Sequence, residues 1–151
     1  MNQVQEGIDD IFNEDNAVKV EYKTIKFGKI GDFVKGTLTG NTKQLVNNLS
    51  PKKEMQTVFE IKVQAGSLHL IHKKQIDATP TVLVPGEFWS YITSKPVMLD
   101  MLKNIKIGQI VGLRLTEIKP AKQPGFDDTK IVKVFPGSMD DTYQGESSGD
   151  L

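Results

Sequence analysis

The feature that most constrains the fold is a pair of alternating segments separated by a loop rich in Pro and Gly. Val111, Leu113 and Leu115 alternate with other residues over 111–116, and Val132 and Val134 do so over 131–135. A period of two is typical of a β-strand with one buried face. Between the segments, Pro120 and Pro124 interrupt any continuous strand and Gly125 permits a turn. The stretch therefore predicts an antiparallel hairpin with a basic loop.

The same period predicts further strands upstream. Residues 32–45 are expected to form one strand with a bend or bulge, because Gly36 and Gly40 interrupt its alternation. A second hairpin is predicted next, with strands at residues 56–63 and 68–72 joined by a turn. The body is therefore expected to be mainly β.

Four other segments complete the predicted organisation. Residues 5–14 carry apolar side chains at helical spacing and predict a short helix that either docks on the body or stays disordered. Residues 17–27 begin with an alternating pattern and predict an edge or lead-in strand. Residues 87–94 contain three aromatic side chains and are expected to form a helical turn. Residues 97–105 carry an apolar stripe and predict a helix.

Charge is segregated along the chain, although its formal net charge is zero. Residues 1–16 hold five acidic residues and residues 137–151 hold four, and neither segment contains Lys or Arg. Residues 17–136 therefore contain all 19 basic residues and ten of the 19 acidic ones. This pattern favours a domain that binds a polyanion, with acidic ends that compete for its surface or recruit a partner. The alternative is a solvated surface with ends that keep it soluble.

Length and composition suggest a single domain at residues 17–136, an acidic segment at 1–16 and a disordered acidic tail at 137–151. The absence of Cys excludes disulfides and thiolate metal sites. No apolar run reaches the roughly 18 residues of a membrane helix, and the first residues lack the features of a signal peptide. We therefore expect a cytoplasmic protein that makes no contact with membranes.

Catalytic and metal-binding motifs are weak. His69 and His72 are two residues apart at a predicted strand end, which does not place them on one metal. Residues 28–36 contain Gly and Lys without the spacing of a phosphate-binding loop. Asp127 and Asp128 form a pair in a loop and lack further acidic partners. We expect no enzyme activity, no cofactor and no metal.

The order of the predicted elements points to a family. A bent strand, a basic loop, a hairpin, a helical connection and a closing hairpin follow one another, which is the order of a five-stranded OB-like Greek-key barrel with its helical connection between strands 3 and 4. Three segments carry the resemblance: GDFVKGTLTG, QTVFEIKVQAGSLHLI and IKIGQIVGLRLTEIKPAKQPGFDDTKIVKVF. They resemble the first strand, central hairpin and closing hairpin of small phage-type single-stranded DNA-binding proteins. The resemblance covers residues 28–136.

This resemblance implies non-catalytic binding of single-stranded DNA with little sequence preference, in support of replication, recombination or repair. For a phage-encoded protein, the compartment would be the host cytoplasm. Binding of this kind requires cations for phosphates and aromatic faces for bases. The expected cations are Lys35, Lys43, Lys52, Lys53, Lys62, Lys73, Lys74, Arg114, Lys119 and Lys122. The expected stacking residues are Phe33, Phe126, Trp89 and Tyr91, the last two being alternatively core residues.

Two alternatives remain open at this level. The acidic tail resembles tails that recruit replication or recombination proteins, but it lacks the Pro-Phe ending of the bacterial examples, so it could instead shield the basic surface. The same barrel could also serve a phage structural or adaptor protein that binds other proteins. Salt-dependent binding of an oligonucleotide would distinguish these readings.

Overall fold

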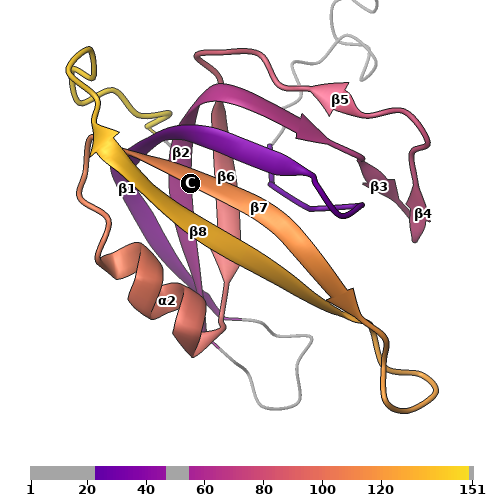
Figure 1. Ribbon diagram of the computed structural model, residues 1–151. Helices are drawn as coiled ribbons and strands as arrows, with labels where there is room; N and C mark the ends of the chain where they lie inside the picture. Colours follow the sequence, from indigo (N-terminus) through magenta and orange to yellow (C-terminus); the bar gives the residue numbers. More distant parts are fainter. Residues whose placement is uncertain (1–22, 47–54, 150–151) are drawn as a thin grey trace, which may run out of the picture.

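The computed structural model describes residues 23–46 and 55–149 of the chain (Figure 1). These residues are mainly β, as predicted, with one six-stranded sheet, one two-stranded sheet and a single helix within the described ranges. The predictions for residues 5–14, for residues 17–22 of the expected strand, and for Lys52 and Lys53 lie outside the described residues. Residues 23–27 form only an isolated bridge, from Thr24 to Ser90, so the predicted strand is wrong for this part of the chain.

The elements follow one another as strands with one helix before the last hairpin (Figure 1). The large sheet has the order β5-β2-β1-β7-β8, and β6 also pairs with β2. Every ladder in the sheet is antiparallel, and β3 and β4 form a separate small hairpin. The bounds are β1 (Phe33–Val46), β2 (Met55–Leu68), β3 (Ile71–His72), β4 (Gln75–Ile76), β5 (Thr81–Val82), β6 (Phe88–Thr93), α2 (Pro96–Lys103), β7 (Gln109–Lys119) and β8 (Thr129–Met139).

The sheet is strongly curved but is not closed, because no ladder joins β6 to β8 within the described residues. The helix α2 contacts β8 beside this opening (Figure 1). It begins at Pro96, where the missing N–H of proline costs no hydrogen bond. Met98 and Leu102 of the predicted apolar stripe are buried, whereas Val97 at its start is 68% exposed. The closing hairpin of β7 and β8 is confirmed.

Alternate residues of the long strands build one core inside the curved sheet. In β7, Val111, Leu113 and Leu115 are fully buried, as their alternation predicted. Burial of such side chains is the main stabilising contribution to a domain of this size. The other central members are Val34, Leu38, Phe59, Ile61, Val63, Trp89, Tyr91, Met98 and Leu102.

β2 is one long strand, so the predicted hairpin turn at residues 64–67 is wrong. Residues 65 and 66 continue the ladder with β1, and a shift in register leaves Gln64 as the extra residue of a bulge. Gly66 is needed here for close packing, because a Cβ at this position would lie 2.7 Å from Cδ1 of Leu83. The glycine that suggested a turn therefore accommodates a neighbouring side chain.

Residues 87–94 predicted a helical turn, but the structure has strand β6 there, paired with β2. Trp89, Tyr91 and Thr93 are buried, and the residues between them are only partly buried. This is the period of a strand that pairs along β2. Residues 68–72, predicted as the third strand, instead end β2 and form β3 of the small hairpin.

Residues 137–149, which the sequence predicted as a disordered tail, are described by the structure and contact the sheet. β8 continues past residue 137, and the N–H of Asp140 donates to the carbonyl of Gly108 at 2.7 Å. Farther along, the N–H of Ser148 donates to Oε1 of Glu60 at 2.9 Å. These contacts hold a polar segment against the sheet even though few of its side chains are apolar.

Candidate nucleic-acid interface

The outward side of β1, β7 and β8 carries an aromatic side chain beside two cations. Phe33 of β1 is paired with Arg114 of β7, which is paired in turn with Lys133 of β8. The Cζ atom of Arg114 lies 5.5 Å from the centroid of the Phe33 ring, which is a cation–π contact. Arg114 and Lys133 are exposed and Phe33 is half-buried. This row presents a π-face with positive charge on one side of it.

The next row along the same strands contains a hollow. Lys35 pairs with Gly112, and Gly112 pairs with Phe135. Because Gly112 has no side chain, the floor between Lys35 and Phe135 is open, and a Cβ there would have Phe135 Cβ at 3.5 Å as its nearest neighbour. Phe135 is 50% exposed and forms one wall.

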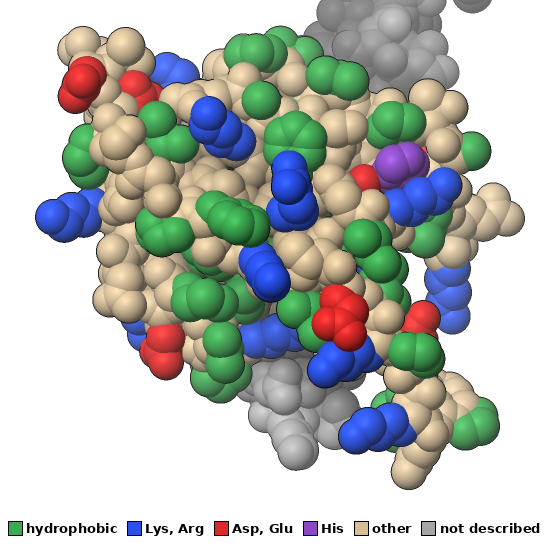
Figure 2. All heavy atoms as spheres, viewed as in Figure 1, with side chains coloured by type: hydrophobic (Ala, Val, Ile, Leu, Met, Phe, Trp, Pro, Cys, Tyr) green, Lys and Arg blue, Asp and Glu red, His purple; other side chains and the backbone are tan. Residues whose placement is uncertain are grey.

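Apart from Lys133, which lies beside it, the residues of these two rows line a groove of about 400 Å³, called the Phe33 groove below. Figure 2 shows Lys and Arg side chains spread among hydrophobic ones over the face that faces the viewer. Lys35, Arg114 and Lys133 form no ion pair with any described carboxylate. Their charge is therefore available to an anion. The lining residues are Phe33, Val34, Lys35, Ile110, Gly112, Leu113, Arg114, Phe135, Pro136 and Gly137.

The acidic C-terminal segment lies at one end of this face. Oγ1 of Thr37, one row beyond Lys35 on β1, donates to Oδ2 of Asp140 at 2.6 Å. Hydrogen bonds from the hydroxyls of Thr142 and then Thr37 lower the pKa of Asp140, so the carboxylate is ionised at neutral pH. An anionic group thus sits next to the basic groove.

A buried carboxylate holds the farther part of the segment. Glu60 is 1% exposed and accepts from Oγ1 of Thr39 at 3.0 Å and from Nδ2 of Asn41 at 3.1 Å. It also accepts from the N–H and the hydroxyl of Ser148. Beside it, Nζ of Lys62 lies 3.6 Å from Oε2 of Glu146. Lys62, a predicted phosphate contact, is therefore paired within the chain.

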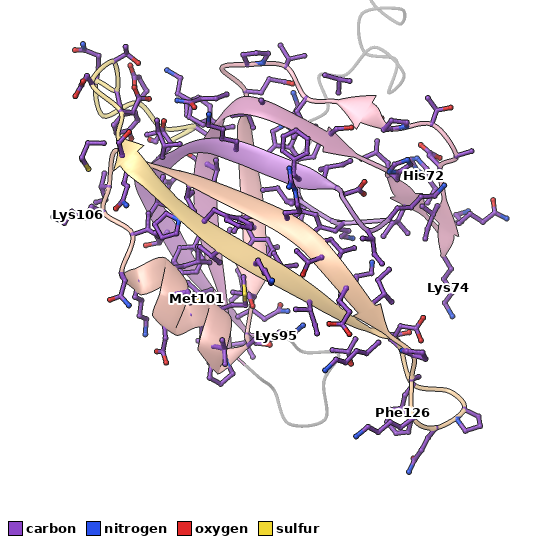
Figure 3. The ribbon with its side chains drawn as sticks, viewed as in Figure 1. His72, Lys74, Lys95, Met101, Lys106 and Phe126 are labelled. Atoms are coloured by element: carbon purple, nitrogen blue, oxygen red, sulfur yellow. The ribbon has the colours of Figure 1, made fainter. Side chains whose placement is uncertain are left out.

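The remaining predicted cations lie at the edges and loops of the molecule. Lys43 is exposed near the end of β1, and Lys73 and Lys74 form the turn between β3 and β4. Lys119 and Lys122 lie at the β7–β8 loop, which also carries the exposed Phe126. Figure 3 shows Phe126 on this projecting loop and Lys74 on the small hairpin. Neither residue lines the Phe33 groove.

Trp89 and Tyr91 do not form a stacking surface, because both are buried core residues, at 9% and 8% exposure. The Tyr91 ring packs edge-on against Phe27, with centroids 6.3 Å apart. Burial raises the pKa of Tyr91, and a hydrogen bond with Thr93 opposes this effect. Trp89 and Tyr91 are therefore core residues, which was the alternative to stacking that the sequence left open.

Several surface residues were missed by the sequence prediction. Lys133 and Phe135 are two residues apart on β8, as Phe33 and Lys35 are on β1, and that spacing was the available signal. Lys95 and Lys130 were missed because their proximity depends on the fold. They line, with Lys74, a groove of about 670 Å³ between the small hairpin and the β7–β8 loop.

The histidines take structural positions. Nδ1 of His69 lies 2.6 Å from Oδ1 of the buried Asp32, and Nε2 of His72 lies 3.3 Å from Oδ2 of Asp77. Across residues 23–46 and 55–149, there is no group of three or more His, Cys, Asp or Glu side chains that could hold a metal ion. Among the described side chains, each histidine pairs with one carboxylate.

No family model, curated protein or solved structure matches the chain. None of the helices in the described ranges has the length and apolar character needed to cross a membrane. What the chain binds is therefore inferred below from the chemistry of its own surface.

Proposed function

We propose that the chain binds single-stranded DNA without catalysis and with little sequence preference, and that the Phe33 groove is the central contact. The observation that carries this proposal is the pairing of Phe33 with Arg114 beside the open floor at Gly112. A planar base fits against an aromatic wall above a floor without side chains. The phosphates on either side of it then meet Lys35 and Lys133.

The physical chemistry of the groove supports low sequence preference. Every base has a π-face, so stacking on Phe33 or Phe135 does not select one base over another. Arg114 contributes a planar cation that can stack or bind a phosphate in a bidentate manner. Hydrogen bonding to base edges would be needed for strong selection, and the groove is lined mainly by apolar and cationic side chains. A role in replication, recombination or repair, in a phage, belongs to the same proposal.

The strand order supports an OB-type assignment as part of this proposal. β1 lies between β2 and β7, β6 pairs with the other edge of β2, and α2 precedes the hairpin of β7 and β8. The OB-fold has a helix in the same connection and is a partly open barrel. We take β1, β2, β6, β7 and β8 as the five barrel strands and the opening between β6 and β8 as the incomplete closure.

The test is the binding of a fluorescein-labelled oligo(dT) to the full chain, followed by anisotropy at several salt concentrations. The logarithm of the association constant is expected to fall with the logarithm of salt, by a slope of about −0.7 per contacted phosphate. Phe33→Leu and Arg114→Met are each expected to weaken binding by about 1–3 kcal/mol. Absence of binding, or binding without a salt dependence, would contradict the proposal.

Two controls localise the site. Lys103→Met removes an exposed cation from α2 and is expected to leave the affinity within twofold. Phe126→Leu removes the exposed aromatic ring of the β7–β8 loop. If this variant loses affinity while Phe33→Leu does not, the site lies on the loop and not in the Phe33 groove.

A second candidate function, a protein-binding adaptor, is favoured by one observation. Val97 of α2 is 68% exposed beside an apolar groove on the other side of β8. This reading predicts that oligonucleotides do not bind and that a protein partner co-purifies in fixed stoichiometry.

A further inference from the structure

A second groove, of about 460 Å³, lies between α2 and β8 and is called the α2–β8 groove below. Its floor and walls come from Tyr91, residues 95–98, Met101 and residues 129–135. It lies at the opening of the sheet, where β6 and β8 form no ladder. Val97 and Phe135 leave large apolar surfaces exposed along it. Figure 3 shows Met101 and Lys95 on and beside α2, next to β8.

The rim of this apolar groove is basic. Nζ of Lys95 donates to the carbonyl of Lys130 at 3.1 Å, and Nζ of Lys130 donates to the carbonyl of Phe27 at 2.6 Å. Together with Lys133, these lysines line the groove and make no ion pair with a described carboxylate. The groove therefore suits an occupant that combines apolar side chains with carboxylates.

We propose that this occupant is the segment 5–15 of the same chain. Ile8, Ile11 and Phe12 have the i, i+3, i+4 spacing of one helical face. The segment contains five acidic residues and no Lys or Arg, which is the complement of the basic rim. Apolar contact supplies the affinity, and the lysines select for the acidic segment because exposed ion pairs add little stability.

The length of the chain allows this docking. The described chain begins at Lys23, which forms an ion pair with Glu87 and whose carbonyl accepts from the N–H of Ser90. From Ser90 to Lys95 the chain advances five residues, about 17 Å in a strand. Residues 16–22 span at most about 23 Å when extended, so the segment reaches the groove.

A disulfide test suits this chain because its sequence contains no Cys. One variant carries Ile11→Cys with Val97→Cys, at the rim of the groove. The matched control carries Ile11→Cys with Val84→Cys. Val84 is 58% exposed and its carbonyl accepts from the N–H of Glu87, so it lies beside the point where the described chain begins. An undocked segment would therefore meet Val84→Cys more often than Val97→Cys.

We expect the intramolecular disulfide with Val97→Cys to form at least tenfold faster than with Val84→Cys under mild oxidation. Both substitutions are at exposed positions, and circular dichroism before oxidation checks that each variant is folded. Adding Lys95→Glu and Lys133→Glu to the first variant is expected to slow its cross-linking severalfold. Equal rates at the two positions would overturn the proposal.

Disulfide-linked dimers in place of intramolecular products would overturn it as well, and would assign the groove to the segment of a second copy. Unchanged cross-linking after charge reversal would remove the basis on which the acidic segment was chosen. None of these measurements involves DNA, so the result is independent of the proposed function.

Discussion

The side chain of Asp32, just before β1, accepts several hydrogen bonds from neighbouring backbone N–H groups. It is 3% exposed. Its Oδ2 accepts from the N–H groups of Gly28 at 2.8 Å, Lys29 at 3.1 Å and His69 at 2.8 Å, and its Oδ1 contacts the His69 ring. Asp32 thus fixes the turn before β1 to the end of β2.

Removal of this acceptor is expected to destabilise the protein. Asp32→Ala leaves three N–H groups without a partner and should cost about 2–4 kcal/mol in the free energy of unfolding. Asp32→Asn keeps an oxygen for the same N–H groups and an amide group beside the His69 ring, so we expect a smaller cost. Urea unfolding at pH 7 measures both. Equal losses in the two variants would contradict this account.

The same residue makes stability depend on pH. Burial raises the pKa of Asp32, but hydrogen bonds from the His69 side chain and from backbone N–H groups outweigh this, so its pKa lies below the usual value. The stabilisation is therefore present above the unfolded-state pKa of about 3.9 and is lost as the pH falls through the folded-state value. Unfolding experiments between pH 6 and pH 3 should show a shallower acid loss in Asp32→Asn than in the wild type.

Lys73 and Lys74 occupy a strained turn. Their φ angles are 48° and 70°, and the paired residues on either side are His72 and Gln75. A two-residue turn with two positive φ angles favours Asn-Gly, and two lysines there cost roughly 1 kcal/mol or more each. The strain persists at an exposed pair of cations, which is a position where function can require it.

Replacement of this pair by Asn-Gly should therefore stabilise the fold by about 1–2 kcal/mol. If both lysines contact phosphates, the salt slope for oligo(dT) should become shallower by about 1.4 at the same time. Thermal unfolding and anisotropy on the same variant measure the two effects. A stable variant with the wild-type salt slope would place Lys73 and Lys74 outside the binding surface.

The segment that follows β8 adds negative charge beside a basic face. Asp140 bonds to Thr37, and Glu146 lies against Lys62. The pair Asp140→Asn and Glu146→Gln keeps the size of both side chains and removes two charges. We expect it to tighten oligo(dT) binding by about three- to tenfold at low salt, with the difference fading as salt screens the charges.

Recruitment of replication or recombination proteins by this segment is the competing proposal. In that case the neutralised variant should bind oligo(dT) like the wild type and lose a partner in a pull-down. Ser148→Ala serves as a control, because it weakens the attachment to Glu60 without changing the charge. A change in DNA affinity at high salt as large as at low salt would contradict the electrostatic explanation.

At the scale of the whole molecule, the sequence predicts what local alternation and helical spacing encode. The hairpin of β7 and β8 and the helix α2 follow from such patterns, and so do the outward positions of Phe33, Lys35 and Arg114. β6 was misread because its clustered aromatic residues suggested a turn of helix, whereas pairing with β2 decides the outcome.

The features that the sequence did not predict depend on contacts between residues far apart in the chain. Glu60 and Ser148 lie 88 residues apart, and no local pattern links them. The same holds for the two grooves, whose walls come from separate strands and from α2. Alternation can place Lys133 and Phe135 on a face of β8, but only the strand order places them beside Arg114 and Gly112.

Phe135 of β8 lies where the two grooves meet. Its ring lines both the Phe33 groove and the α2–β8 groove, so the two cavities share one wall. An occupant that turns this ring changes the shape that the other groove presents. If a ligand in one cavity alters affinity in the other by some factor, thermodynamic reciprocity requires the same factor in the opposite direction. Under the two proposals above, Phe135 would therefore link DNA binding in one groove to docking in the other.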